Sequence, residues 1–271
     1  VLECPGYVIG FENEKPVEEY PVNCIECGHC VAICPVTAVT HDNLPIENFP
    51  EMTDSGIKFD QFHQLGRNRR SIRHFKDEPI AREQLDKIME SVRYAPTGEN
   101  AQELKYTIIS NPHQLEQIKE FMASKFKLLG TLAKWFYPFL ILASGKKEAQ
   151  RMRSSLKQLN QNYDENKEEG EDPFLRTAPT ILIIHAKNKT QMSPVDAGIA
   201  GYHVVLACQT LGIGTVWNGF HQVFCGLFGK LKKLSLIPKG HKVLSTICMG
   251  YPKFKYKRQV HRKTLDIAYK T

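Results

Sequence analysis

The sequence predicts an α+β protein in which helices cover a sheet, preceded by a small cysteine-rich module. Segments with apolar residues at helical spacing alternate with short apolar runs of strand length. Five of the eight cysteines lie within the first 34 residues. A polar stretch with several prolines follows them. We therefore expect a module at residues 1–41, a linker at 42–58 and a larger domain at 59–271.

The charge distribution supports this division. Residues 1–55 hold ten acidic residues and one lysine, a balance of −9, so the remainder must carry +16 to give the net charge of +7. We expect the acidic and basic parts to attract each other, within one chain or across a dimer. The basic excess suits a phosphate-bearing cofactor. The cations are scattered and no nucleic-acid motif is present, so a nucleic-acid partner is not expected.

The module carries the spacing C-x2-C-x2-C-x3-C-P at Cys24, Cys27, Cys30 and Cys34. This is the spacing by which bacterial ferredoxins bind a 4Fe–4S cluster. Zinc sites usually pair C-x2-C units across a longer spacer, so zinc is disfavoured. A disulfide scaffold is disfavoured as well, because the chain is long and shows no signal peptide. We expect a reducing, cytoplasmic environment and redox chemistry.

Ligand counting adds a fifth cysteine. In two-cluster ferredoxins the fourth cysteine of each motif serves the other cluster. Cys4, which also precedes a proline, is therefore assigned to the cluster of Cys24, Cys27 and Cys30. Cys34 then belongs to a second cluster, whose other cysteines would lie upstream of Val1, or is a buried free thiol. The module is expected to be truncated at its N-terminus.

The larger domain is predicted from its periodicity. The helix at 81–94 has Leu85, Ile88, Met89 and Val92 on one face and stops before Pro96. The continuous apolar run at 179–185 fits a buried strand. The stretch from 135 to 143 is apolar but too short to span a bilayer, so it is a buried element or a lid and no membrane contact is expected. The remaining expected elements are helices at 61–69, 112–126 and 196–211, strands at 106–109, 214–217 and 242–249, a charged helix and loop at 146–172, and an extended basic tail at 253–263.

Three segments of this domain carry candidate binding groups. In the extended stretch 69–73, alternation is expected to place Arg69, Ser71 and Arg73 on one side, where they could clamp a phosphate. Residues 95–102 form a turn with hydroxyl and amide groups. Residues 212–220 contain glycines that would let the backbone approach a flat ring closely.

Together these segments resemble the FMN-dependent nitroreductase family. The resemblance covers about residues 62–260 and consists of R-R-S-x-R-x-F, A-P-T-G-x-N-x-Q, G-x-G-x-x-W-x-G-F and a late G-Y-P followed by K-R, in that order. With the cysteine module, the whole chain resembles the ferredoxin–nitroreductase fusion subfamily. The resemblance implies a nitroreductase-like sheet covered by helices, a small ferredoxin-like domain, and an obligate homodimer with FMN at the subunit interface.

The resemblance also implies roles for individual residues. A backbone N–H of the segment 217–219 is expected to face flavin N5; Asn218 stands where some relatives have glutamate. No side chain is expected to act as a dedicated acid or base. The cofactor-binding residues implied are Arg69, Arg70, Ser71 and Arg73 near the phosphate and ribityl chain, Pro96, Thr97, Gly98 and Asn100 in a turn that reaches the flavin of the other subunit, Trp217, Asn218 and Gly219 beside the ring, and Lys255 or Lys257 with Arg258 near the phosphate.

The function expected is reduction of nitro compounds, quinones or similar electrophiles by FMN, with electrons delivered through iron–sulfur from a donor such as reduced ferredoxin. No glycine fingerprint for a nicotinamide cofactor is present. One alternative is an electron-transfer protein that relays electrons to a protein partner. Another is a dehalogenase-like reductase on the same fold.

Overall fold

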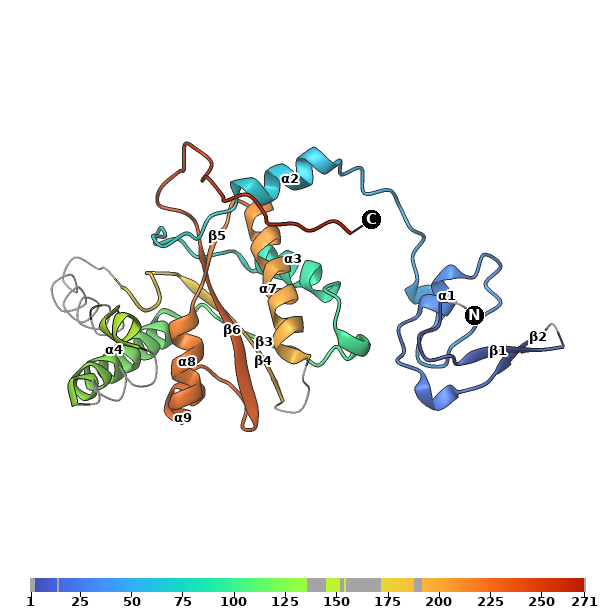
Figure 1. Ribbon diagram of the computed structural model, residues 1–271, viewed down its shortest axis with the longest axis horizontal. Helices are drawn as coiled ribbons and strands as arrows, with labels where there is room; N and C mark the ends of the chain where they lie inside the picture. The colour runs from blue at the N-terminus through green and yellow to red at the C-terminus, as the bar shows by residue number, and fades with distance from the viewer. Residues whose placement is uncertain are drawn as a thin grey trace. The chain divides into compact units, whose positions relative to one another are not determined.

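The computed structural model describes residues 3–13, 15–135, 145–151, 154, 172–187 and 192–270. The chain forms two compact units (Figure 1). The smaller comprises Val1–Lys58 with Pro96–Gln102, and the larger comprises Phe59–Ala95 with Glu103–Thr271. The predicted apolar stretch after Trp135 and most of the charged segment 146–172 lie outside the described residues.

The larger unit is built on a four-stranded antiparallel sheet in the order β3-β4-β6-β5. The two long strands, β4 (Thr180–Lys187) and β6 (His241–Gly250), are central. The shorter β3 (Lys105–Ile109) and β5 (Gly214–Trp217) form the edges. The α+β class is confirmed, and every described strand of this sheet lies within two residues of its predicted bounds.

Both faces of the sheet are covered, which explains the continuous apolar run in β4. Ile181 and Ile183 pack into one core, and Leu182 and Ile184, which point the other way, pack into a second. Residues of α4, α8 and α9 complete the first core, and residues of α3 and α7 complete the second (Figure 1). The bounds of these helices are Arg82–Arg93 for α3, Pro112–Trp135 for α4, Ser193–Thr210 for α7, Gly219–Leu227 for α8 and Gly229–Leu234 for α9.

Two helices of the larger unit were not predicted. Both are short: α8 mixes aromatic and glycine residues, and α9 is a single six-residue segment that is too short to show a helical period. The start of α8 is fixed by the side chain of Asn218, whose Oδ1 accepts the backbone N–H of His221 at 3.0 Å. The predicted helix at 61–69 is α2, Phe59–Asn68. The predicted helix at 112–126 is longer than expected, since α4 continues to Trp135.

The smaller unit contains little regular structure. A two-stranded antiparallel ribbon of β1 (Ile9–Glu12) and β2 (Lys15–Glu18) precedes α1 (His29–Ile33). Three short 3-10 turns complete it, at Pro21–Asn23, Ile46–Asn48 and Gly98–Asn100.

Part of the stretch predicted as linker packs on the cysteine loop. The ring of Phe49 lies so close to Gly28 that a Cβ there would meet it at 2.9 Å, and Gly28 has a φ of +73°. The side-chain amide of Asn43 donates to Glu26 Oε1 at 2.7 Å. Residues 43–49 are therefore part of the folded unit, held by contacts that the polar, proline-containing composition does not reveal.

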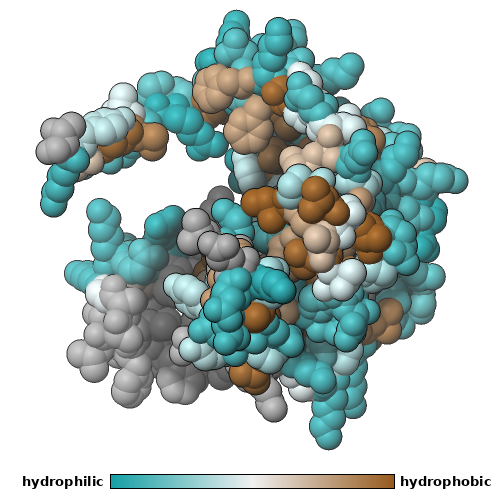
Figure 2. Space-filling view, turned by 90° about the vertical axis from the view of Figure 1, so that its right-hand side faces the viewer, coloured by the Kyte–Doolittle hydropathy of each residue, from teal (hydrophilic) through white to brown (hydrophobic). Residues whose placement is uncertain are grey.

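The surface of the described chain mixes polar and apolar groups. Figure 2, which presents the right-hand side of Figure 1, shows apolar groups in patches between polar ones. Among the described helices, none is long and apolar enough to cross a membrane.

Candidate functional site

Four cysteines of the smaller unit line one cavity of about 590 Å³, which we call the cysteine cavity. They are Cys4, Cys24, Cys27 and Cys30. These are the four residues that ligand counting grouped together, although Cys4 lies twenty positions before Cys24 in sequence. Cys34 is not among the lining residues of this cavity.

Cys4 and Cys34 nevertheless have matching local structures. In each, the N–H four residues later points at the sulfur: Val8 donates to Cys4 Sγ at 3.3 Å and Ala38 to Cys34 Sγ at 3.2 Å. In each, the N–H three residues later donates to the cysteine carbonyl, at 3.2 and 3.4 Å. The residues at that third position, Tyr7 and Thr37, both have a positive φ near 50°. The two Cys-Pro turns are thus repeats of one conformation.

These N–H groups affect the ionisation of the two thiols. For Cys34, backbone hydrogen bonds from Val36 and Ala38 hold the pKa below its usual value. For Cys4, burial raises the pKa, but the amides of Val8 and its neighbours outweigh this effect and the net pKa is lowered. Both turns therefore favour the thiolate form of their cysteine, which is the form that binds metal.

A site for a single metal ion brings several ligand side chains together around one point. Among the described residues, no group of three His, Cys, Asp or Glu side chains is placed to hold a single ion. A cubane of four irons and four sulfides is wider than one ion, so its thiolates lie around a cavity. In the cysteine cavity four cysteines lie around one hollow, and one backbone N–H, that of Val8, points at a sulfur of this set.

The predicted turn at 96–102 belongs to the smaller unit, where it is hydrogen-bonded to the cysteine loop. The amide Nδ2 of Asn100 donates to the carbonyls of Ile25 and Glu26, at 3.1 and 2.9 Å. Thr97 Oγ1 accepts the N–H of Gln102 at 3.1 Å, which closes the turn. Pro96 and Gly98 lie in the same turn, in which Glu99, Asn100 and Gln102 have a positive φ near 50°. The side-chain donor of Asn100 is therefore directed at the loop between Cys24 and Cys27.

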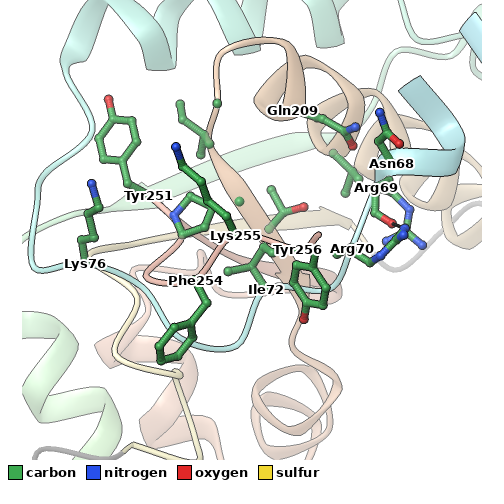
Figure 3. Close-up of a pocket in the computed structure, with 16 residues that line it drawn as sticks. Asn68, Arg69, Arg70, Ile72, Lys76, Gln209, Tyr251, Phe254, Lys255 and Tyr256 are labelled. Atoms are coloured by element: carbon green, nitrogen blue, oxygen red, sulfur yellow. Dashed lines mark hydrogen bonds between the residues drawn. The ribbon is translucent and has the colours of Figure 1, made fainter. Parts of the chain in front are cut away.

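A second cavity, of about 500 Å³, lies in the larger unit and is lined by Arg69, Arg70, Lys76 and Lys255. We call it the basic cavity. Among the described residues, none of those lining it is acidic. Figure 3 shows Lys76 on one side, Arg69 and Arg70 on the other, and Lys255 between them. Four cations around one hollow suit a phosphate.

Arg70 has much of its hydrogen-bonding capacity taken up by the chain itself. Its Nη1 donates to the carbonyls of Arg67 and Arg69, both at 2.7 Å, and its Nη2 donates to the carbonyl of Arg258 at 3.2 Å. Its guanidinium also lies 5.8 Å from the ring centre of Tyr256. Arg70 thus ties the end of α2 to the C-terminal tail, and Arg258 takes part through its backbone carbonyl.

Arg69 and Arg73 do not share one cavity. Ser71 forms an isolated parallel bridge with Thr215 of β5, and the N–H of Ile72 donates to Thr215 O at 2.9 Å. The rest of 69–73 is not regular strand, so strict alternation fails there. Arg69 lines the basic cavity, and Arg73 lines a third cavity, of about 630 Å³. The expectation that Arg69, Ser71 and Arg73 face one side is corrected accordingly.

The third cavity, which we call the aromatic cavity, is lined by the predicted segment Trp217, Asn218 and Gly219. The aromatic residues Phe126, Phe174, Phe220 and Phe224 also line it. The ring centres of Phe126 lie 5.4 Å from Phe174 and 5.9 Å from Phe220. A wall of aromatic edges and faces suits a planar ligand.

The Asn218 side chain is structural. It is buried, its Nδ2 donates to Phe174 O at 2.7 Å, and its Oδ1 caps α8. Its backbone N–H donates to Thr246 O at 2.7 Å. The next amides, of Gly219 and Phe220, open α8, where helix geometry provides no acceptor from the helix itself. Asparagine is therefore used here for its side-chain hydrogen bonds, which an aliphatic residue would not provide.

Trp217 packs across helix α7. Its ring lies so close to Gly201 that a Cβ at that position would overlap it. The ring is still 41% exposed, so one part packs on the helix and another part faces the aromatic cavity. The glycine-rich sequence of α7 thus has a packing role that periodicity alone did not indicate.

Two cavity-lining cations were not predicted. Lys76 lines the basic cavity. It follows the motif 69–75 directly, and this position is the sequence feature that could have indicated a further phosphate-binding cation. Arg176 lines the aromatic cavity from the turn before β4. It has a φ of +63°, and Thr177 follows with +56°. Such backbone strain is invisible in a sequence and is common near binding sites.

The remaining cysteines are buried thiols, as predicted. Cys208, Cys225 and Cys248 are almost fully inaccessible. Burial raises the pKa of Cys208 and of Cys248 to about 12, and that of Cys225 to about 11. They remain protonated and inert at neutral pH.

Comparisons with known proteins agree with this architecture. The profile of the Nitroreductase family matches residues 67–251, more than half of the chain. Iodotyrosine deiodinase 1 of Rattus norvegicus is 23% identical over 240 residues, covering 84% of this chain and 75% of that protein. The FMN reductase (NAD(P)H) of Bacillus subtilis strain 168 is 27% identical over 183 residues, covering 68% and 62%.

A solved structure shows the same fold. The nitroreductase from Bacteroides fragilis NCTC 9343, crystallised with bound FMN, superposes with a TM-score of 0.54 and 21% identity. The match covers 76% of this chain and 98% of that one. The family profile spans the whole sheet and the segment that bears Arg69, Arg73 and Lys76, and it ends before Lys255. The chain therefore belongs to the nitroreductase family, and it is a flavin-dependent oxidoreductase.

Proposed function

We propose that the larger unit binds FMN along β5, with the phosphate in the basic cavity and the ring in the aromatic cavity. The observation that carries this proposal is that one strand lines both. Gly214 and Thr215 line the basic cavity, and Val216 and Trp217 line the aromatic one. A ligand with an anionic end and a planar end matches that order. The FMN bound to the Bacteroides nitroreductase supports the choice of flavin.

The chain's own groups would hold the two ends differently. Arg69, Lys76 and Lys255 offer charge to the phosphate, while Arg70 holds the tail in place. At the ring, Arg73 and the first amides of α8 offer hydrogen bonds, and the positive end of that helix favours negative charge on the flavin. Bound FMN would supply electron transfer, in single or paired steps, to an acceptor lying against the ring.

For the smaller unit we propose a 4Fe–4S cluster held by Cys4, Cys24, Cys27 and Cys30. The shared cavity and the N–H directed at Cys4 support it. Cys34 has the same local conformation as Cys4, so its thiolate is equally suited to bind iron. The cluster would accept single electrons from a donor such as reduced ferredoxin.

The proposed reaction is reduction of a nitro compound, a quinone or a similar electrophile. Among the described residues that line the aromatic cavity there is no Asp, Glu, His, Lys or Tyr to act as acid or base, so water would provide protons. We also propose a homodimer with FMN at the subunit interface, as the family resemblance implies. Phe220, Val223 and Leu227 of α8 support it, since each is at least 40% exposed and they lie on one side of the helix.

The test is anaerobic purification followed by measurement of iron, acid-labile sulfide and FMN per chain, and then reduction of a nitroaromatic and a quinone with dithionite-reduced ferredoxin. The proposal expects one FMN, about four irons and turnover of at least one acceptor. Flavin without iron would reject the cluster. Iron without flavin would reject the site along β5. Both cofactors without turnover would favour an electron relay to a protein partner.

A second candidate function is reductive dehalogenation. It is favoured by the similarity to rat iodotyrosine deiodinase 1, which covers 84% of this chain. Halogenated phenols offered in the same assay, with halide release as the measurement, would separate it from nitro and quinone reduction. Halide release faster than nitro reduction would make dehalogenation the main activity.

A further inference from the structure

Arg176 is a cation at the aromatic cavity that the proposed flavin site does not require. Arg73 already faces this cavity from the segment 69–73. Arg176 reaches it from a different element, the turn before β4, and is partly buried. Within the described part of the chain, no carboxylate forms an ion pair with its guanidinium. Its charge is therefore available to a ligand.

The turn that carries Arg176 is held rigidly. The buried carboxylate of Asp172 accepts the N–H groups of Phe174, Leu175 and Thr177, at 2.8, 3.0 and 3.4 Å. The N–H of Arg176 donates to the carbonyl of Asp172 at 2.9 Å. From the other side, Asn218 binds the carbonyl of Phe174.

This anchoring keeps two successive residues in the left-handed region, which costs free energy at residues other than glycine. A relaxed turn would present Arg176 elsewhere. A ligand-binding role for the Arg176 side chain would explain why the buried carboxylate of Asp172 maintains this strained backbone.

The surroundings of Arg176 define the chemistry of its partner. Phe126, Phe174 and Phe220 give the cavity aromatic walls, and the two cations that line it are arginines. Among its described lining residues none is acidic. Aromatic walls with an arginine at the margin suit a flat ring bearing a carboxylate or phenolate, since guanidinium binds such oxygens in bidentate fashion.

Resting on the proposed flavin site, we propose that Arg176 is a specificity residue that selects aromatic acceptors bearing an anionic group. The neutral part of the acceptor lies among the phenylalanines, and the anion pairs with the guanidinium. Arg73 remains with the flavin. Asp172 is a positioning residue that acts through the turn.

Binding of two matched probes tests this inference. Benzoate and benzamide have nearly the same shape and differ in charge. Each is titrated into the purified holoenzyme, and binding is followed by the flavin absorption and by the fluorescence of Trp217, which lines the cavity. The variants are Arg176→Gln, the conservative Arg176→Lys, and Arg93→Gln as a control arginine on α3, which packs on the other face of the sheet.

We expect Arg176→Gln to weaken benzoate about tenfold or more, the size of a lost charge-assisted hydrogen bond, and to leave benzamide unchanged. Arg176→Lys should retain part of the affinity for benzoate. The control Arg93→Gln should bind benzoate as tightly as the wild type. The KM for 4-nitrobenzoate should rise in Arg176→Gln while that for 4-nitrobenzamide does not.

Two results would overturn the inference. Equal weakening of both probes would mean that Arg176 only supports packing. A fall in FMN content in Arg176→Gln would assign the guanidinium to the cofactor. A wild-type protein without FMN would reject the flavin site instead, and Trp217 fluorescence would still show whether benzoate binding depends on Arg176.

Discussion

The two units of this chain are stabilised in different ways. The larger has two apolar cores, one on each face of its sheet, and central strand residues such as Ile181 and Ile183 are fully buried. In the smaller, Val31 is the one described large apolar side chain that is buried, while five cysteines lie in it. A unit of this size with one large buried apolar side chain among its described residues has a small apolar core, so its stability is marginal. We therefore expect its fold to depend on the cluster proposed at its cysteines.

The largest effect is expected from removing one proposed iron ligand. Cys27→Ser should abolish nearly all bound iron and unfold the smaller unit, because metal binding supplies most of its folding free energy. The larger unit should keep its thermal unfolding temperature. Iron analysis and limited proteolysis measure the two effects.

Cys34→Ser is the matched control, since Cys34 does not line the cysteine cavity. It should retain about four irons per chain. If Cys27→Ser left the smaller unit as resistant to protease as the wild type, the contrast between the units would be wrong.

The reciprocal change is a truncation in the core of the larger unit. Ile183→Ala at a fully buried position should lower the free energy of unfolding by about 2–5 kcal/mol and leave the iron content unchanged. Urea unfolding followed by tryptophan fluorescence measures it, because both tryptophans, Trp135 and Trp217, lie in the larger unit.

Ile33→Ala in α1 is the control for that measurement. Ile33 is 61% exposed, so its truncation should change stability by less than about 0.5 kcal/mol. A loss of less than about 1 kcal/mol in Ile183→Ala would show that the larger unit does not rest on this core.

A smaller effect is expected from acid. Burial lowers the pKa of His221 to about 4, and its two ring nitrogens contact Thr246 and Ser235 hydroxyls at 2.9 Å. The unfolded chain titrates this histidine near pH 6.5, so between pH 6.5 and 4 the unfolded state binds more protons. Stability of the larger unit should therefore fall by roughly 2–4 kcal/mol as the pH drops through this range.

His185 contributes in the same direction, because burial, His241 and Lys105 lower its pKa to about 4. Urea unfolding at pH 7, 6 and 5 measures the slope. His221→Gln should flatten it. A slope unchanged in that variant would mean that His221 does not stay neutral in the folded protein.

The smallest effect concerns the turn that joins the cysteine loop. Asn100→Ala removes the donor to Ile25 and Glu26 and should weaken the local structure by about 1–2 kcal/mol. Hydrogen exchange at residues 24–27 should accelerate while urea unfolding of the larger unit is unchanged. Glu47→Ala, an exposed change in the same unit, is the control. Unchanged exchange in Asn100→Ala would show that the loop is held by other contacts.

The sequence predicted the framework of the larger unit well. Strands such as β4 are long apolar runs, and helices such as α3 show a clear period, so local patterns sufficed. The sequence predicted structure less well in segments where the pattern of apolar residues is weak. Helices α8 and α9 were missed, and the packing of residues 43–49 depends on a ring that lies against Gly28.

What the sequence by itself determined is the set of donor groups: the cysteine spacing, the second Cys-Pro pair at Cys4, and the segments that bear arginine and tryptophan. These follow from residue type and interval. The tertiary structure alone decided which cavity or loop each of these groups contacts. A single bridge at Ser71 separates Arg69 from Arg73, Asn100 turns to the cysteine loop, and Arg176 reaches the aromatic cavity. Each depends on contacts between segments far apart in the chain, which local patterns do not encode.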